Sequence, residues 1–349
     1  MGWKQLQEQA LIKYLLWRSR PKRLRRFLAG KEYFPIPSTV GDTVKVAAVQ
    51  QKLSLISDPL AYAGEMYARV RQAVDMGAQL VVFPEDNTTQ LLGMLPGLSA
   101  ADNVTEAVGE LDPQLKVADI FNYLSPVTRQ VYYNVFSYLA ARFNIHLLGG
   151  SIIVCDRRGR TVNQASLFGP DGKILGTQMK LHLLPVEVEW GLSCGEELSV
   201  FDTAVGKLAF PICMDATYFE TFRIAVSKGA ELVIIPAANP DEYNPWKELR
   251  GVWPRVQESG VYGIRASMVG EVLGMRLTGR SAIFAPLEIT PNQDGILAQA
   301  ESFDQQEMVI SELDYKKLRQ YRRQFGFESY LNKELCKKYL PHLYGTSPG

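Results

Sequence analysis

The stretch GAQLVVFP at residues 77–84 returns as GAELVIIP at residues 229–236, and this repeat decides the fold class. Each copy is a short run of apolar residues, as in a buried strand, and each run ends at a proline. A helical stretch precedes each copy, so both glycines stand where a helix C-terminus favours glycine. Earlier strands, VKVAAVQ at residues 44–50 and one within GKLAFPICMD at residues 206–215, complete the two units. Strand, helix and strand occurring twice predict an α/β fold with two similar halves.

The segments around the repeat add further strands. FSYLAARFNIHLLGGSIIV at residues 136–154 predicts a helix followed by a strand. QASLFGPDGKILGTQMK at residues 164–180 predicts a hairpin that turns at Asp171–Gly172. Residues 281–300 predict another strand pair, and residues 313–324 predict a terminal helix. The prolines that end the repeated strands direct the next residues to the carboxyl edge of the sheet, where open α/β sheets bind ligands.

Composition limits the function classes. The chain has 349 residues, of which 46% are hydrophobic and 21% charged, so it can bury a large core. The net charge of +1 does not favour nucleic acid as a partner. Four scattered cysteines predict a reducing, cytoplasmic location, and no apolar run approaches the ~18–20 residues that span a bilayer. Only three histidines occur, which disfavours a Ser-His-Asp triad and a histidine-built metal site.

The ends of the chain differ from its middle. We expect residues 1–40 to be a basic amphipathic extension and linker, residues 41–325 to be one α/β domain, and residues 326–349 to be a tail. Apolar residues from Trp3 to Trp17 recur at helical spacing, and a cluster of arginines and lysines follows them around Pro21. Two interpretations stay open: this helix docks on its own domain or a partner subunit, or residues 1–30 lie on an anionic membrane surface, which would make the protein peripheral on the inner face of the membrane.

Three reactive residues stand at strand ends. Glu85 follows LVVFP, Lys180 ends ILGTQMK, and Cys213 follows LAFPI. Each has an ordinary structural explanation by itself. Together they could form a nucleophilic site, because an ammonium lowers a thiol pKa, a carboxylate can carry the thiol proton to a leaving amine, and a lysine can stabilise an oxyanion.

These segments resemble a known family. VVFPED, MKLHLLPVE and GKLAFPICMD are similar to three motifs of the nitrilase superfamily of carbon–nitrogen hydrolases, and the resemblance covers about residues 44–323. It implies a four-layer αββα sandwich with two mixed sheets, no cofactor, and assembly into homo-oligomers. It also implies that Glu85 is the general base, Lys180 the oxyanion residue and Cys213 the nucleophile. Glu187 matches a second glutamate of the family, although Glu189 is close enough to take that role instead.

One position departs from the family. Amidase and carbamoylase branches commonly carry Cys-Tyr-Asp and nitrile hydrolases Cys-Trp-Glu, whereas this chain has Cys213-Met214-Asp215. Asp215 favours the amide branches. The flexible thioether of Met214 indicates a roomy, apolar wall and therefore an apolar acyl group. We assign substrate binding to Met214 and to Asn239, which follows the second repeated strand. Ser281 lacks a nucleophile elbow and is interpreted as structural.

The leading hypothesis is an amidase that cleaves a small non-peptide amide through a Cys213 thioester. The alternative is an N-acyltransferase that passes the same thioester to an amine. A nitrilase, an N-carbamoyl hydrolase and a non-catalytic scaffold on the same fold stay open behind these two.

Overall fold

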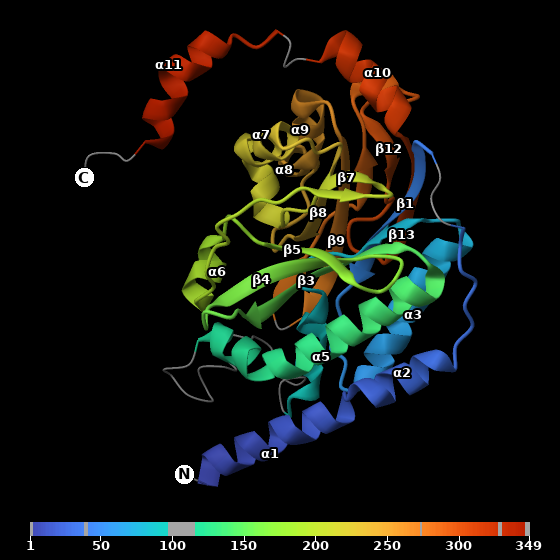
Figure 1. The fold of residues 1–349 in the computed structure, drawn as a ribbon. Coiled ribbons are helices and arrows are strands. Elements are labelled where there is room, and N and C mark those ends of the chain that lie inside the picture. Colours follow the sequence, from blue (N-terminus) through green and yellow to red (C-terminus); the bar gives the residue numbers. More distant parts are fainter. Residues whose placement is uncertain (1–2, 38–40, 97–115, 273, 327–329, 346–349) are drawn as a thin grey trace.

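The computed structural model describes residues 3–37, 41–96, 116–272, 274–326 and 330–345, and it is an α/β fold with a nearly closed sheet (Figure 1). Strand β1 (Thr43–Lys52) lies at its centre. It pairs in parallel with β2 (Leu80–Val82) and, through Gln51 and Lys52, with β9 (Tyr262–Val272). The strand order is β5-β4-β3-β2-β1-β9-β8-β7-β6, so β1 joins two half-sheets.

The first half-sheet also contains β3 (His146–Cys155), β4 (Thr161–Phe168), β5 (Ile174–Met179) and β13 (Glu307–Asp314). The second contains β6 (Phe201–Thr203), β7 (Gly206–Ala209), β8 (Leu232–Ala238), β11 (Ala282–Phe284) and β12 (Ile296–Gln299), with β10 (Met275–Leu277) paired to β9. The predicted hairpin is β4–β5, and the predicted strand pair at residues 281–300 is β11–β12.

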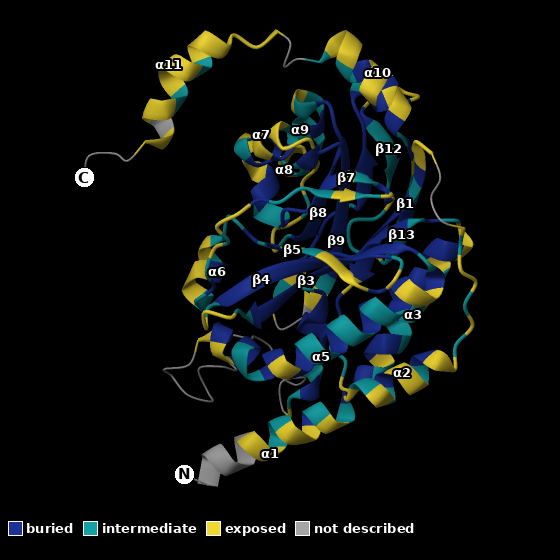
Figure 2. Cartoon of the chain, in the orientation of Figure 1, coloured by how far each residue is buried: buried dark blue, intermediate teal, exposed yellow. Residues whose placement is uncertain are grey.

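Three buried clusters define four layers. Val46, Ala48 and Val82 pack with Leu208 and Ile234 between the half-sheets. Outside the first half-sheet lie α3 (Pro59–Asp75) and α5 (Val117–Phe143), and outside the second lie α7 (Phe219–Ser227) and α9 (Val252–Ser259). Figure 2 shows central strands such as β4 and β8 buried and the outer surfaces of the helices exposed. The predicted αββα sandwich is confirmed, with the refinement that β1 makes the two sheets continuous.

The repeat has the helix, glycine turn and strand that its sequence predicts, but the prediction that each proline ends its strand is wrong for the second copy, because β8 continues through Pro236 to Ala238 and stays paired with β9. After α3, Gly77 adopts a φ of 87°, and after α7, Gly229 adopts a φ of 92°. These left-handed conformations end each helix and turn the chain into β2 and β8. β2 runs parallel to β1, and β8 runs parallel to β7 and β9. The residues that follow β2 and β8 therefore meet at the carboxyl edges of the two half-sheets.

A glycine-dependent bulge shapes the first edge. The register of β3 against β4 shifts between Leu148 and Ser151. Gly150 lies within this shift at a φ of 73°, and a Cβ there would stand 1.9 Å from the carbonyl oxygen of Pro84. Only glycine allows this close approach. The backbone at Pro84, which follows β2 and precedes Glu85, therefore packs directly against this bulge.

The N-terminal segment forms two helices, α1 (Trp3–Arg18) and α2 (Pro21–Ala29). Leu15, Leu24 and Leu28 are fully buried in the cluster that contains α3 and α5. Gln130 of α5 donates hydrogen bonds to the Leu16 carbonyl and to Ser19 Oγ. Of the two interpretations offered for this segment, docking on its own domain agrees with this packing.

The remaining helices are α6 (Pro185–Trp190), α8 (Pro245–Glu248), α10 (Tyr315–Phe325) and α11 (Lys333–Tyr344), with short 3-10 helices η1 (Asn87–Met94), η3 (Cys213–Thr217) and η4 (Leu287–Ile289). Residues 97–115, together with residues 327–329 and 346–349 of the expected tail, lie outside the described residues. In the described ranges, no helix is long and apolar enough to cross a bilayer.

Candidate active site

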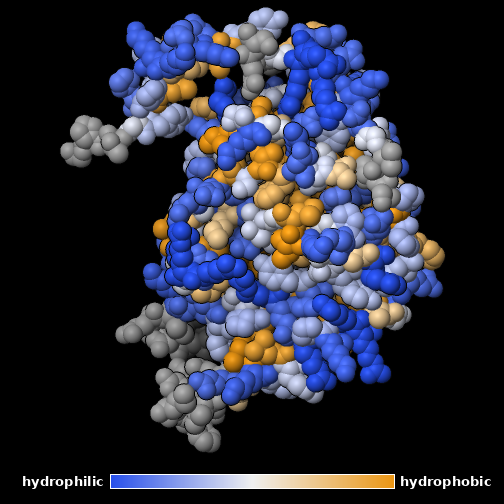
Figure 3. Space-filling model, in the orientation of Figure 1, coloured by the Kyte–Doolittle hydropathy of each residue, from blue (hydrophilic) through white to orange (hydrophobic). Residues whose placement is uncertain are grey.

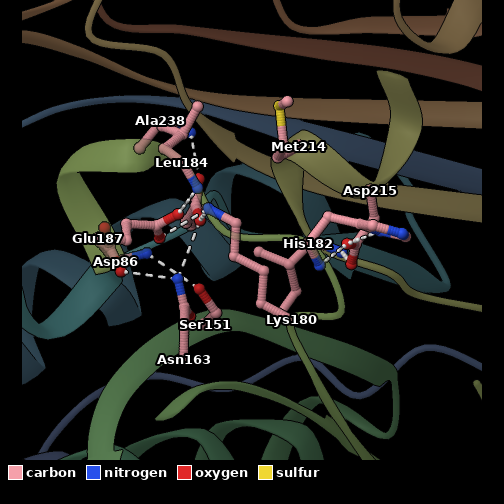
Figure 4. Close-up of polar contacts among 12 residues, drawn as sticks. Asp86, Ser151, Asn163, Lys180, His182, Leu184, Glu187, Met214, Asp215 and Ala238 are labelled. Atoms are coloured by element: carbon pink, nitrogen blue, oxygen red, sulfur yellow. Dashed lines mark hydrogen bonds and ion pairs between the residues drawn. The ribbon is translucent and has the colours of Figure 1, made fainter. Parts of the chain in front are cut away.

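A buried lysine stands between two glutamates at the edge of the sheets (Figure 4). Lys180 Nζ lies 2.8 Å from Glu85 Oε1 and 2.7 Å from Glu187 Oε1. The side chains of Lys180, Glu85 and Glu187 are 1%, 2% and 7% exposed, respectively. Glu189 is exposed on the same short helix as Glu187. Glu187 therefore contacts Lys180 at the site, whereas Glu189 is exposed to solvent.

Glu85 is held from both half-sheets. Its Oε1 accepts hydrogen bonds from Lys180 and from Asn163 Nδ2 on β4, the latter at 2.9 Å. Its Oε2 accepts a hydrogen bond from the Ala238 backbone N–H at the end of β8, at 2.8 Å. The Cys213 thiol lies within hydrogen-bonding reach of the same carboxylate. A carboxylate fixed in this way has one orientation toward the sulfur.

Cys213 stands on a sharp turn between β7 and α7. Its φ is 46°, a left-handed conformation that few residues other than glycine adopt. Such a backbone costs about 1–3 kcal/mol and persists only when its surroundings enforce it. The side chain is half-buried and lines a cavity of about 290 Å³. Cys213 is therefore presented to a cavity by a constrained turn, which an inert packing cysteine would not need.

Burial controls the protonation of the site. Desolvation raises the pKa of Cys213 well above its usual value, and the nearby Glu85 carboxylate adds to this increase. Desolvation also raises the pKa of Glu85, although Lys180 opposes it. For Lys180, desolvation would lower the pKa, but Glu85, Cys213 and Glu187 outweigh it and hold the pKa well above its usual value. The resting thiol is therefore neutral beside a base and an ammonium.

Asp215 ties the lysine segment to the cysteine turn. Its buried carboxylate accepts hydrogen bonds from the backbone N–H of Ile212 at 2.8 Å and of His182 at 2.7 Å. It also accepts from Leu181 N at 3.1 Å and contacts His182 Nδ1 at 2.9 Å. Figure 4 shows Asp215 and His182 directed toward each other. Asp215 thus fixes the position of Lys180 relative to Cys213.

The other predicted site residues line the same cavity. Met214 and Asn239 both border the space of about 290 Å³ at Cys213. A smaller cavity of about 60 Å³ lies on the Glu85, Lys180 and Glu187 side, and Leu184 borders both. A larger space of about 650 Å³ beside β5 is lined by none of these catalytic candidates. Ser281 is buried, and its Oγ accepts a hydrogen bond from Ser267 N, in agreement with a structural role.

Sequence reasoning missed several partners. Asn163, the Ala238 backbone and the carboxylate of Asp86 all lie at the site. Asn163 donates to both Glu85 and Asp86, and burial together with Glu85 raises the pKa of Asp86 well above its usual value. A polar residue inside the buried strand VNQASLF was the available signal for Asn163. The contact from Ala238 cannot be predicted from its residue type, because it is made by the backbone N–H.

The fold and this arrangement of side chains agree with the family that the sequence resembles. The carbon–nitrogen hydrolase family model matches residues 45–323, and the chain belongs to this family, within the nitrilase superfamily. It is accordingly an enzyme that acts on carbon–nitrogen bonds other than peptide bonds.

Named relatives agree with this assignment. The chain is 30% identical over 308 residues to the probable hydrolase YhcX of Bacillus subtilis, covering 87% of this chain but only 54% of that relative. It is 28% identical to the omega-amidase NIT2 of Mus musculus, covering 81% of this chain and 92% of that relative.

Two solved structures share the fold. Nit3 of Saccharomyces cerevisiae, a member of branch 10 of the nitrilase superfamily, superposes with a TM-score of 0.62 at 24% identity over 83% of this chain and 96% of its own. A mutant amidase from Nesterenkonia sp. AN1, with the acetamide moiety of fluoroacetamide added at its active-site cysteine, gives 0.63 at 18% identity over 87% and 99%.

Proposed function

We propose that the protein hydrolyses a small non-peptide amide through a thioester on Cys213. The observation that carries this proposal is the buried Glu85–Lys180–Glu187 arrangement beside a cysteine on a left-handed turn. The amidases among the relatives support an amide substrate. The aspartate at position 215 supports it as well, as the family resemblance implies.

The mechanism uses one carboxylate as a proton shuttle. Glu85 takes the thiol proton while Cys213 Sγ attacks the amide carbon, and Lys180 Nζ and the Met214 N–H stabilise the oxyanion. Glu85 then gives its proton to the amide nitrogen, the C–N bond breaks, and the thioester forms. Next, Glu85 deprotonates a water that attacks the thioester, and the thiolate leaves and is reprotonated. Glu187 holds Lys180 and the Leu184 N–H throughout.

Mass spectrometry tests the covalent step. The enzyme is mixed with amides, N-carbamoyl compounds and nitriles of increasing chain length, and intact mass is measured within one turnover. We expect an acyl adduct on Cys213 and release of ammonia or amine, with neither in Cys213→Ala. Absence of any adduct and of any product across the whole panel would refute the proposal. Labelled amine acceptors in the same reactions distinguish hydrolysis from N-acyl transfer, because transfer leaves the label in the product.

We further propose that the chief role of α1 and α2 is to cover α5, and that residues 41–325 form the catalytic unit. If this segment contacts an anionic membrane, we assign the contact to Tyr14 and Trp17, which are 53% and 55% exposed. Arg18 lies over the Tyr14 ring and Arg20 over the Trp17 ring. Sedimentation with phosphatidylserine vesicles tests this role: replacing both aromatic residues by alanine should abolish binding, and unchanged binding would exclude this surface.

We also propose a homo-oligomer. Phe219 and Ile224 of α7 are 41% and 46% exposed, and Leu335 and Tyr339 of α11 are 55% and 53% exposed. Figure 1 shows α11 extending away from the body of the fold, and Figure 3 shows hydrophobic patches among hydrophilic residues on one face. A second copy would bury these apolar side chains. Light scattering should give a molecular mass that is a multiple of 39.1 kDa, and Ile224→Asp should lower this mass. A mass of one chain at all protein concentrations would refute the proposed oligomer.

A further inference from the structure

We propose that the groove of about 650 Å³ beside β5 is a second ligand site, which binds a small molecule that carries a phosphate or diphosphate group. The groove lies at the β5 edge of the first half-sheet, among α5, the turn between β3 and β4, and residues 196–199 (Figure 1). No catalytic candidate lines it, so this proposal does not depend on the amidase function. The evidence is the set of arginines that line the groove, namely Arg129, Arg157, Arg158 and Arg160.

Two of these arginines are neutralised by carboxylates of the protein. Arg160 Nε lies 2.9 Å from Asp156 Oδ2, and Arg160 Nη1 lies 2.8 Å from Glu196 Oε1. Arg158 Nη1 lies 3.0 Å from the same oxygen of Glu196. Asp156 also accepts hydrogen bonds from the backbone N–H groups of Arg160 and Arg158, and the first of these is the main cause of its lowered pKa. These two cations and two carboxylates therefore balance one another.

The other two arginines, Arg129 and Arg157, have no carboxylate partner in the ranges that the structure describes. Arg129 projects from α5 and donates a hydrogen bond from Nη1 to the Cys155 carbonyl at 3.1 Å. Its guanidinium also lies over the Tyr133 ring, 5.7 Å from the centroid. These contacts orient the guanidinium but use only part of its five N–H donors. Arg129 therefore keeps donors for a ligand, and the exposed Arg157 adds a second positive charge.

The remaining lining agrees with an anionic ligand. Tyr133 Oη accepts a hydrogen bond from Gln164 Nε2 at 2.9 Å, so the hydroxyl can donate its own hydrogen to a ligand. Thr177 and Ser199 add two further hydroxyl groups. Glu197 is the third carboxylate of the lining, so four arginines face three carboxylates and one positive charge is in excess among the described lining residues.

Phosphate chemistry fits this arrangement. A guanidinium donates paired hydrogen bonds to two oxygens of a phosphate, and a dianion matches two unpaired cations. Sites for small molecules have volumes of roughly 300–1,000 Å³, so the groove has room for more than the phosphate group itself. Gln164 follows Asn163, and Met179 precedes Lys180, so a ligand in the groove would contact the strands behind the catalytic residues without entering the Cys213 cavity.

Titration calorimetry of the full chain with pyrophosphate tests the site. We expect one pyrophosphate to bind per chain. Arg129→Leu should weaken binding about 10- to 100-fold, the range expected for hydrogen bonds to a charged group. Arg129→Lys should give an intermediate affinity, because lysine keeps the charge without the fork. Arg142→Leu is the matched control and should leave the affinity unchanged, since Arg142 lies on the same helix over the Tyr33 ring but does not line the groove.

Two further variants keep the test independent of α5. Glu197 is exposed, so Glu197→Gln removes a repelling carboxylate and should tighten pyrophosphate binding about 2- to 5-fold. Arg250→Leu removes a cation from the Cys213 cavity and should keep the wild-type affinity. Thermal unfolding checks that each variant is folded, and pyrophosphate should raise the Tm of the wild type more than that of Arg129→Leu.

Three results would overturn the proposal. The first is the absence of pyrophosphate binding to the wild type, and the second is equal affinity in Arg129→Leu and Arg142→Leu. The third is loss of binding in Arg250→Leu, which would place the anion in the Cys213 cavity instead. The amidase function is tested separately by the acyl adduct, so either proposal can fail while the other stands.

Discussion

Replacing Asp215 by asparagine tests how the site is aligned. The carboxylate is fully buried and receives backbone N–H groups on both oxygens, Ile212 on Oδ2 and His182 on Oδ1. Asparagine has one acceptor oxygen, so its NH2 group would face the Ile212 N–H or the His182 N–H. Hydrogen bonds to charged groups contribute about 1.5–3 kcal/mol each, and a buried donor without a partner costs about 1–3 kcal/mol. We expect a loss of about 2–4 kcal/mol in the free energy of unfolding.

For a chain of this length, that loss corresponds to a decrease of about 3–5 °C in Tm. Because Asp215 connects the Lys180 segment to the Cys213 turn, we also expect kcat/KM to fall about 100-fold, the effect of a small misplacement of reacting groups. Urea unfolding and amide turnover at 20 °C measure the two effects. Asp202→Asn is the matched control, since Asp202 is 77% exposed. A stability within about 0.5 kcal/mol of wild type would refute the hydrogen-bond argument, and unchanged turnover in a destabilised variant would refute the alignment role.

Three further substitutions test other parts of the structure. Glu85→Gln should lower turnover about 10²–10⁴-fold through loss of the proton shuttle, whereas the exposed Glu189→Gln should keep it; equal turnover in both variants would contradict the mechanism. His146 is buried, which lowers its pKa from 6.5 to about 4, so the native state binds fewer protons than the unfolded state between these values. The contribution of the neutral His146 to the free energy of unfolding is therefore fully present above pH 6.5 and should fall by about 3 kcal/mol as the pH drops to 4. His146→Leu should therefore reduce the dependence of the free energy of unfolding on pH, measured by urea unfolding at several pH values. An identical pH dependence in the variant would show that carboxylates alone cause it. Leu24→Ala should cost about 2–5 kcal/mol in urea unfolding, because Leu24 is fully buried, and a cost near that of the exposed Tyr14→Ala would mean that α2 is detached in solution.

Local patterns predict much of this fold. The repeat at residues 77–84 and 229–236 predicts β2, β8 and their preceding helices, because apolar runs and helix-ending glycines act within a few residues. The hairpin at Asp171–Gly172 follows from turn chemistry. The continuity of the two sheets through Gln51 and Lys52 is different, since pairing between β1 and β9 joins residues more than two hundred positions apart.

The candidate site likewise contains residues that the sequence predicts and partners that only the packed fold reveals. Glu85, Lys180 and Cys213 stand out because each ends a strand. Asn163 and Asp215 were missed as partners, since their roles depend on which backbone groups the packed fold brings to them.

The orientation of Glu85 depends on both half-sheets, so the proposed activity requires the complete fold. Its two oxygens are held by Asn163, Lys180 and Ala238, which lie 78, 95 and 153 positions away in the chain. No half of the molecule contains all of these contacts. A chain that has formed only the first half-sheet therefore holds Glu85, Asn163 and Lys180 without Cys213, and one that has formed only the second half-sheet holds Cys213 without Glu85. Under the proposed mechanism, Cys213 can therefore become reactive only after the two halves have docked.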